Sequence, residues 1–225
     1  MSSSLDYYCV GDAVCDEILG LLSKFGNEAI AKRGIFRVGV SGGSIADILA
    51  EGMYDIRTDF TKWQIFFCDE RIVPVDMNCT LSPTEAAADY EKTIRKAFNM
   101  ENTTDIPSFD LLILGIGPDG HTASLFPGHP LLDEKTKLIA AITDSPKPPP
   151  NRVTMTYPLI NNAKICMFGA QGQSKAEVLK RILVDKDESL PVTRVDPKNG
   201  ELIFIACDEA DSLIDVDPTR KAKKG

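Results

Sequence analysis

The chain has 225 residues, of which 43% are hydrophobic, and its formal net charge is −8. A chain with this much apolar sequence can form a sizeable core, which argues against global disorder. Its acidic balance argues against a nucleic-acid partner, because contacts with phosphates need clustered cations.

Helix-like and strand-like segments alternate along the chain. Apolar residues recur at helical spacing over 12–25, 45–53, 83–98 and 174–183. Short apolar runs typical of strands lie at 36–40, 64–68, 111–114, 138–142, 164–168 and 202–206. This alternation predicts an α/β protein with a Rossmann-like, doubly wound, mainly parallel sheet that is flanked by helices. We expect the chain before the first strand to form a packing helix.

One stretch could separate two domains. Residues 144–152 contain three consecutive prolines, which force an extended backbone. Strands are predicted on both sides of this stretch, so we expect a single domain over 1–225 and a monomer. The basic cluster in the last ten residues, 216–225, is interpreted as part of a flexible, solvated tail.

A glycine-rich turn follows the first strong strand and opens a predicted helix. The turn contains Ser41, Gly42, Gly43 and Ser44. Small residues let backbone N–H groups approach an anion, and a helix N-terminus favours negative charge. The turn is therefore a candidate phosphate cradle, although an ordinary strand-to-helix turn is equally consistent with it. Its sequence matches neither the dinucleotide-binding fingerprint nor the Walker loop, so it does not indicate a nucleotide ligand.

The same turn also spells Gly-x-Ser-x-Gly, the pattern of a nucleophile elbow. Ser41 as the nucleophile of an esterase or amidase, with His121 as its base, is therefore a rival hypothesis. Chain order weakens it, because the elbow pattern places its histidine late and this chain has its two histidines in the middle.

Three cations could complete an anion site. Arg71 follows the second strand, and its guanidinium could bind a phosphate or a carbonyl oxygen, or pair with Asp69 or Glu70 to fix the loop. Arg152 follows the proline run and Lys175 lies near a helix start. Each alone is typical of a solvated surface charge, but together they could close a site around the turn.

The most informative run is 114–130, which follows an apolar strand and contains Asp119 and His121. Ligands of open α/β sheets bind at the carboxyl ends of strands. An imidazole titrates near neutral pH, so His121 at this place suggests proton transfer. His129, in a Gly-His-Pro turn, is interpreted as structural.

The remaining features predict location and cofactors. Residues 1–6 lack a basic region and a long apolar core, so we expect no signal peptide, and no apolar run could span a bilayer. Cys68, Cys166 and Cys207 lie in apolar runs without any Cys-x-x-Cys pair, as expected of buried free thiols in a reducing compartment. We therefore expect a cytoplasmic protein with no membrane partner and no metal site.

Three motifs, in this order, resemble those of one family. They lie at 41–44, 69–74 and 117–128, and the third, Gly-Pro-Asp-Gly-His-Thr-Ala-Ser-Leu-Phe-Pro-Gly, is long and specific. On these motifs the chain resembles the 6-phosphogluconolactonases of the glucosamine-6-phosphate isomerase/6-phosphogluconolactonase family, over roughly 36–206. The related deaminases carry Asp-Glu-Tyr where this chain has Asp-Glu-Arg. One departure from the lactonase pattern is a shortened segment at 76–82, at the rim of the expected pocket.

The resemblance implies hydrolysis of 6-phospho-D-glucono-1,5-lactone to 6-phosphogluconate, in the oxidative pentose phosphate pathway, without metal or cofactor. His121 would take a proton from water, Asp119 would orient the imidazole, and Arg71 would stabilise the developing charge. The phosphate would be held by Ser41, Gly42, Gly43, Ser44, Arg152 and Lys175. The alternatives are a serine hydrolase that uses Ser41 and a noncatalytic protein that binds sugar phosphates.

Overall fold

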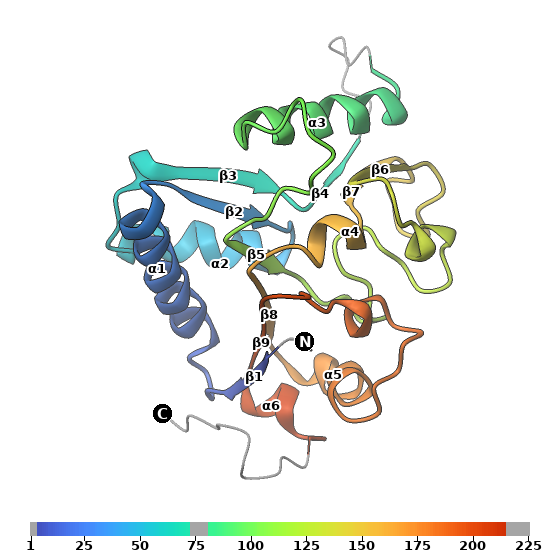
Figure 1. Cartoon of the computed structure of the whole chain (residues 1–225). Coiled ribbons are helices and arrows are strands. Elements are labelled where there is room, and N and C mark those ends of the chain that lie inside the picture. The colour runs from blue at the N-terminus through green and yellow to red at the C-terminus, as the bar shows by residue number, and fades with distance from the viewer. Residues whose placement is uncertain (1–3, 73–80, 215–225) are drawn as a thin grey trace.

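A six-stranded parallel sheet forms the centre of the molecule, seen edge-on in Figure 1. The computed structural model describes residues 4–72 and 81–214. The strands of the sheet, in the spatial order β1-β9-β8-β5-β2-β3, are β1 (Ser4–Cys9), β9 (Glu201–Ala206), β8 (Ile165–Ala170), β5 (Leu111–Leu114), β2 (Phe36–Val40) and β3 (Trp63–Phe67). All neighbouring pairs are parallel. The predicted fold class is confirmed.

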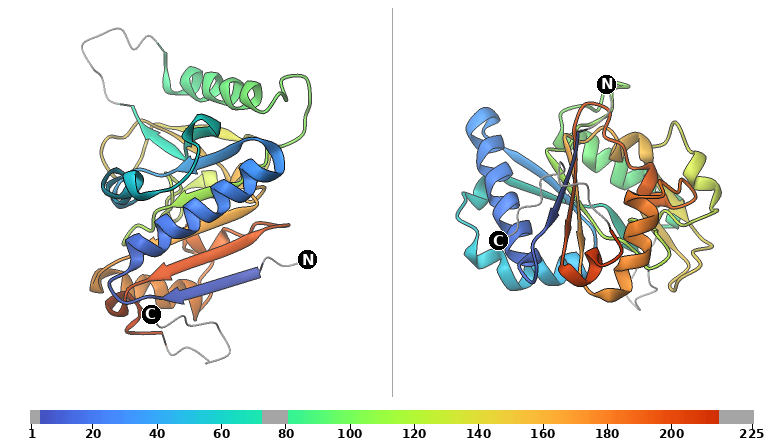
Figure 2. Two further views of the ribbon diagram at one scale, coloured as in Figure 1. Left: turned by 90° about the vertical axis from the view of Figure 1, so that its left-hand side faces the viewer. Right: turned by 90° about the horizontal axis from the view of Figure 1, so that it is seen from below.

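Helices cover both faces of this sheet (Figures 1 and 2). One face is covered by α1 (Val14–Arg33) and α2 (Ser44–Gly52), whose side chains Ile18 and Ile45 both approach Gly169 of β8. The other face is covered by α4 (Tyr157–Ile160) and α5 (Ala176–Leu183), and the short α6 (Asp208–Asp211) follows β9. Short 3-10 helices lie at Met53–Asp55, Phe60–Lys62, Pro130–Asp133, Gln173–Lys175 and Pro191–Arg194.

A second, antiparallel sheet lies beside the first. It has the order β4-β7-β6, formed by β4 (Asp69–Arg71), β7 (Arg152–Met155) and β6 (Ile139–Ile142), and α3 (Pro83–Ala97) packs against β6 and β7. The strand predicted at 138–142 is present, but in this small sheet. Nothing in the sequence patterns predicted β4 or β7, because β4 is a three-residue polar strand and β7 lies beside the proline run.

Cys68 joins the two sheets. Its N–H donates to the Val40 carbonyl of β2 (2.9 Å), and its carbonyl accepts from the N–H of Met155 in β7 (2.8 Å). Since one residue separates β3 from β4, the chain passes directly from the large sheet to the small one at this point. The carboxyl end of the large sheet is thereby fixed against the small sheet.

The N-terminal prediction was partly wrong. The expected helix at 12–25 exists and runs on to Arg33, but it is preceded by the edge strand β1. β1 is polar at Ser4 and Asp6, and of its residues only Tyr7 is buried, so it lacks the continuous apolar run of an internal strand. Its pairing with β9, far away in the sequence, is what makes it a strand.

Further expectations concern the cysteine thiols, a membrane-spanning helix and two segments of the chain. Cys68, Cys166 and Cys207 are buried free thiols, as predicted. No helix in the described part of the chain has both the length and the apolar character needed to cross a membrane. The predicted tail at 216–225 and most of the shortened segment 76–82 lie outside the described residues.

Candidate active site

A cavity of about 510 Å³ opens where the carboxyl ends of β2, β3 and β5 meet the small sheet. This volume is typical of sites for small molecules. Of the predicted site residues, those that line the cavity are Ser41, Gly42, Gly43, Ser44, Arg71, His121, Arg152 and Lys175. Asp119 does not line the wall and instead contacts His121. Both sheets contribute, so residues from distant parts of the sequence converge here.

The glycine-rich turn forms one wall of the cavity. Gly43 has a φ of +70° and precedes α2, a conformation that residues with a side chain rarely adopt. The Ser41 hydroxyl is buried at the wall and has no hydrogen-bond partner within the described residues. A buried polar group without a partner is costly. The wall thus offers a free hydroxyl beside the N-terminus of α2, where an anion is favoured.

Cations face this turn from the small sheet. Arg71 and Arg152 lie directly opposite each other on β4 and β7. Burial, together with the charge of Arg71, lowers the pKa of Arg152, and Asp69 opposes this shift. Like charges directly opposite on a sheet repel each other. An anion between the two guanidiniums would relieve this repulsion.

Arg152 also holds the proline-rich loop. Its guanidinium donates hydrogen bonds to the carbonyl oxygens of Lys147 (2.9 Å), Pro148 (3.1 Å) and Pro149 (3.2 Å). Only 4% of Arg152 is exposed, so these contacts are shielded from water. Lys175, which also lines the cavity, donates to the Ile116 carbonyl (2.6 Å). Burial lowers the pKa of Lys175, and the charge of Lys147 lowers it further.

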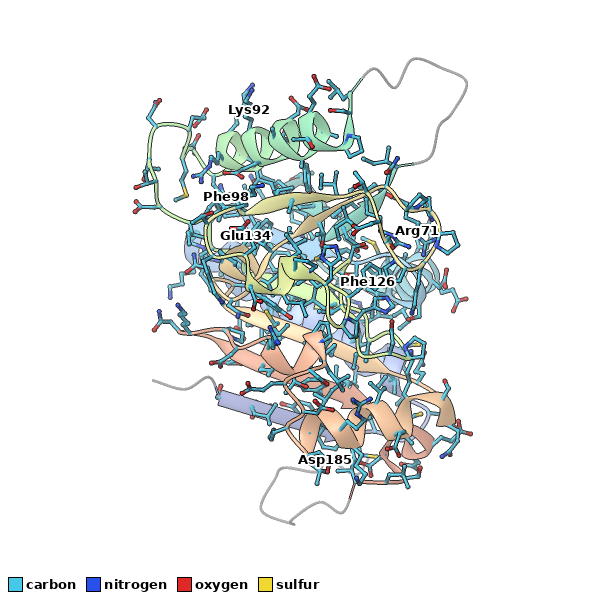
Figure 3. All side chains as sticks on the ribbon, turned by 90° about the vertical axis from the view of Figure 1, so that its right-hand side faces the viewer. Arg71, Lys92, Phe98, Phe126, Glu134 and Asp185 are labelled. Carbon is cyan, nitrogen blue, oxygen red and sulfur yellow. The ribbon has the colours of Figure 1, made fainter. Side chains whose placement is uncertain are left out.

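His121 is held in place on three sides. Its Nδ1 lies 2.5 Å from Oδ1 of Asp119. Its ring packs on that of Phe126, with centroids 4.9 Å apart. A Cβ atom at Gly117 would lie 1.9 Å from Nδ1, so the imidazole occupies space that only a glycine leaves free. Figure 3 labels Phe126, on which the imidazole packs, and Arg71 of β4.

The electrostatics keep His121 neutral and Asp119 ionised at neutral pH. Burial lowers the pKa of His121, Asp119 opposes this shift, and Lys147 reinforces it. Burial alone would raise the pKa of Asp119, but hydrogen bonds from His121 and Lys147 bring it down to about 2. An ionised carboxylate beside Nδ1 places the imidazole proton on Nδ1. Nε2, which has no hydrogen-bond partner among the described residues, is then a free acceptor.

Comparison with known proteins identifies the family. A family model described as glucosamine-6-phosphate isomerases/6-phosphogluconolactonase matches residues 11–79 and 75–204. The chain belongs to this family. It is similar to the 6-phosphogluconolactonase of Rattus norvegicus, with 42% identity over 215 residues, covering 82% of each chain. The corresponding figures for the 6-phosphogluconolactonase of Homo sapiens are 43% over 216 residues, covering 82% of this chain and 83% of the relative.

Solved structures of family members share the fold. The 6-phosphogluconolactonase of Thermotoga maritima superposes with a TM-score of 0.76 at 25% identity, covering 90% of this chain and all of the other. The enzyme of Trypanosoma cruzi gives 0.78 at 24% identity, covering 96% of this chain and 99% of the other. The two ranges of the family match overlap at 75–79.

Ser124 and Lys147 escaped the sequence interpretation, and Asp69 was considered there only as a possible partner of Arg71. Asp69 lines the cavity, and its carboxylate accepts a hydrogen bond from the Ser124 hydroxyl (2.7 Å), while burial raises its pKa. Both residues lie within family motifs, which was the available signal. Lys147 contacts both Asp119 and His121 from 28 and 26 residues away in the sequence, and no local pattern indicated this.

The described residues do not form a serine–histidine dyad. Ser41 and His121 line the same cavity, but no hydrogen bond joins them, and Nδ1 of His121 is engaged by Asp119. His129 lies elsewhere: its Nδ1 accepts from the N–H of Leu131 (3.1 Å) and its Nε2 contacts Asp144 (3.2 Å). His129 therefore caps a 3-10 helix, in agreement with a structural role.

Proposed function

We propose that the chain hydrolyses 6-phospho-D-glucono-1,5-lactone to 6-phosphogluconate. The observation that carries this proposal is the pairing of a neutral imidazole with an anion pocket. Nε2 of His121 is free, and the same cavity contains the glycine-rich turn, Arg71, Arg152 and Lys175. The substrate has the two matching parts, an ester to be attacked and a dianionic phosphate to be held. The family relatives carry the same activity in their names.

The imidazole acts first as a base and then as an acid. Nε2 of His121 takes a proton from water while the water oxygen bonds to C1 of the lactone. Asp119, hydrogen-bonded to Nδ1, stabilises the imidazolium that forms. The tetrahedral intermediate collapses, the bond between C1 and the ring oxygen breaks, and Nε2 returns the proton to that oxygen. The product leaves as the carboxylic acid and loses its carboxyl proton to solvent, so atoms and charge balance and the base is regenerated in its neutral form.

The cations divide two tasks. Arg71, at the exposed end of β4, stabilises the negative charge that develops on the carbonyl oxygen. Ser41, Gly42, Gly43 and Ser44 bind the phosphate at the N-terminus of α2, with Lys175 and the inward edge of Arg152 completing the pocket. Each proton and charge is assigned to a side chain or backbone group, so the proposal invokes no metal and no cofactor. A monomer acting in the cytoplasm on this small molecule remains our prediction.

Hydrolysis of freshly prepared lactone tests the proposal, with the spontaneous rate subtracted. We expect a rate proportional to enzyme concentration. No acceleration by a folded protein that still binds 6-phosphogluconate would indicate a noncatalytic binding protein instead. Labelling of Ser41 by a serine-directed covalent probe, with loss of activity, would indicate the serine hydrolase.

A further inference from the structure

We propose that Lys147 is a positioning residue for the general base: it holds Asp119 and the His121 imidazole in one arrangement and keeps the imidazole unprotonated in the resting enzyme. This inference rests on the proposed function and concerns a side chain that does not line the cavity. Lys147 therefore acts through its two neighbours and does not touch the substrate.

The geometry is a compact triangle of three polar atoms. Nζ of Lys147 lies 3.0 Å from Oδ1 of Asp119 and 3.2 Å from Nδ1 of His121. Those two atoms are themselves 2.5 Å apart. Because Oδ1 accepts from both nitrogens, it is fixed from two directions. The ammonium group thus locks the carboxylate that orients the imidazole.

Lys147 is placed by a loop whose backbone is secured from two sides. Arg152 donates to the carbonyl oxygens of 147, 148 and 149. The hydroxyl of Ser145 donates to the Lys147 carbonyl (2.8 Å) and accepts from its N–H (3.3 Å). Arg152, a residue of the anion pocket, thus supports the loop that carries Lys147, and through Lys147 it supports the position of the base.

The charge balance explains why a lysine is useful here. An ionised Asp119 alone would favour the imidazolium, and Asp69, from the small sheet, adds to that effect. The ammonium of Lys147 opposes both carboxylates, since it repels a proton on His121. Lys175, from the segment before α5, interacts electrostatically with Asp119 and with Lys147. Removing Lys147 leaves two acids facing His121 and, among the described residues, no contacting cation, so the pKa of His121 should rise.

The test is a proton NMR titration of the two histidines, combined with the pH profile of kcat/KM. In wild type we expect the His121 midpoint to lie below the ordinary imidazole value. In Lys147→Met it should move to higher pH, and the acid limb of kcat/KM should move with it. kcat should fall near neutral pH while KM changes little. Lys147→Arg keeps the charge and should restore the wild-type midpoint.

The controls separate this inference from general damage and from the proposed function. The ring signals of His129, whose imidazole contacts Leu131 and Asp144, are an internal reference for the fold. Lys92→Met, on the exposed side of α3 and away from Arg71 and Phe126 (Figure 3), should leave both readouts unchanged. If Lys147→Met does not fold, Lys147→Gln gives the same comparison. An unchanged or lowered His121 midpoint in a folded variant would overturn the inference. Failure of the wild-type protein to hydrolyse lactone would instead overturn the proposed function, and the titration result would still stand.

Discussion

Single residues in this site carry more than one task, and Arg152 is the clearest case. Its guanidinium faces the cavity and the opposing Arg71, and it also donates to three consecutive carbonyl oxygens of the proline-rich loop. Lys175 has a single carbonyl contact, to Ile116, and is free to meet a ligand with its remaining donors. The sequence analysis assigns both residues to the phosphate site, but their different contacts predict different responses to mutation.

We predict that Lys175→Ala mainly raises KM for the lactone, because it removes an anchor used equally in the ground state and the transition state. Arg152→Ala should raise KM and also lower kcat, because the loop that carries Lys147 loses its support. Steady-state kinetics with lactone measure both effects, and Lys198→Ala, an exposed lysine outside the cavity, is the matched control. An unchanged KM in both variants would show that the phosphate binds elsewhere.

The element that matters most is the loop after β5. It leaves the sheet at Leu114 and turns back so that the N–H of Gly117 donates to the His121 carbonyl (2.8 Å). The side chain of His121 then lies over Gly117, and Asp119 reaches Nδ1 from two residues away. The position of the base is thus determined by local backbone geometry at the end of a buried strand.

The variant Gly117→Ala tests this arrangement. The new Cβ would lie 1.9 Å from the imidazole, so the ring must move away from Asp119. Activity should fall by an amount comparable to loss of the base, about 10²–10⁴-fold, while the strands of the core stay in place. Lactone hydrolysis and far-UV circular dichroism make the comparison, and Gly20→Ala in α1, which lies outside the cavity and where a Cβ meets nothing within 4 Å, is the control. Equal activity of the two variants would contradict the geometry.

How well the sequence predicts a feature depends on how far apart in the sequence its interacting residues lie. Five of the six parallel strands, all except β1, were predictable because each is a short apolar run, and the Asp119–His121 pair was predictable because its members are two residues apart. β7 was not predictable, since it follows the proline run, and β1 was not, since it becomes a strand only through β9, which is distant in the sequence. Lys147 was missed for the same reason. The motifs could name Arg152, but not its bonds to the proline-rich loop.

At the scale of the whole molecule, the site exists only where the two sheets meet. The large sheet supplies the glycine-rich turn and His121, and the small sheet supplies Arg71 and Arg152. A chain with a net charge of −8 thus gathers the guanidiniums of Arg71 and Arg152 and the ammonium of Lys175 around one cavity. Cys68 bonds to both sheets through its backbone, so separation of the sheets would break the core as well as the site.

We therefore predict that the molecule unfolds as one unit. Fluorescence of Trp63, the single tryptophan, reports on β3 of the large sheet, and amide exchange of β7 reports on the small one. In urea both should show the same midpoint, and saturating 6-phosphogluconate should shift both equally by mass action. Two separate midpoints would show that the sheets are independent domains.

The most direct measurement of the central claim compares the two histidine variants His121→Ala and His129→Asn in the lactone assay, with spontaneous hydrolysis subtracted. Asparagine can still accept the hydrogen bond from the N–H of Leu131 that His129 now accepts. We predict that His121→Ala stays folded and loses at least about 10²-fold in kcat/KM, whereas His129→Asn remains close to wild type. Near-normal turnover by folded His121→Ala would contradict the assignment of this imidazole as the base.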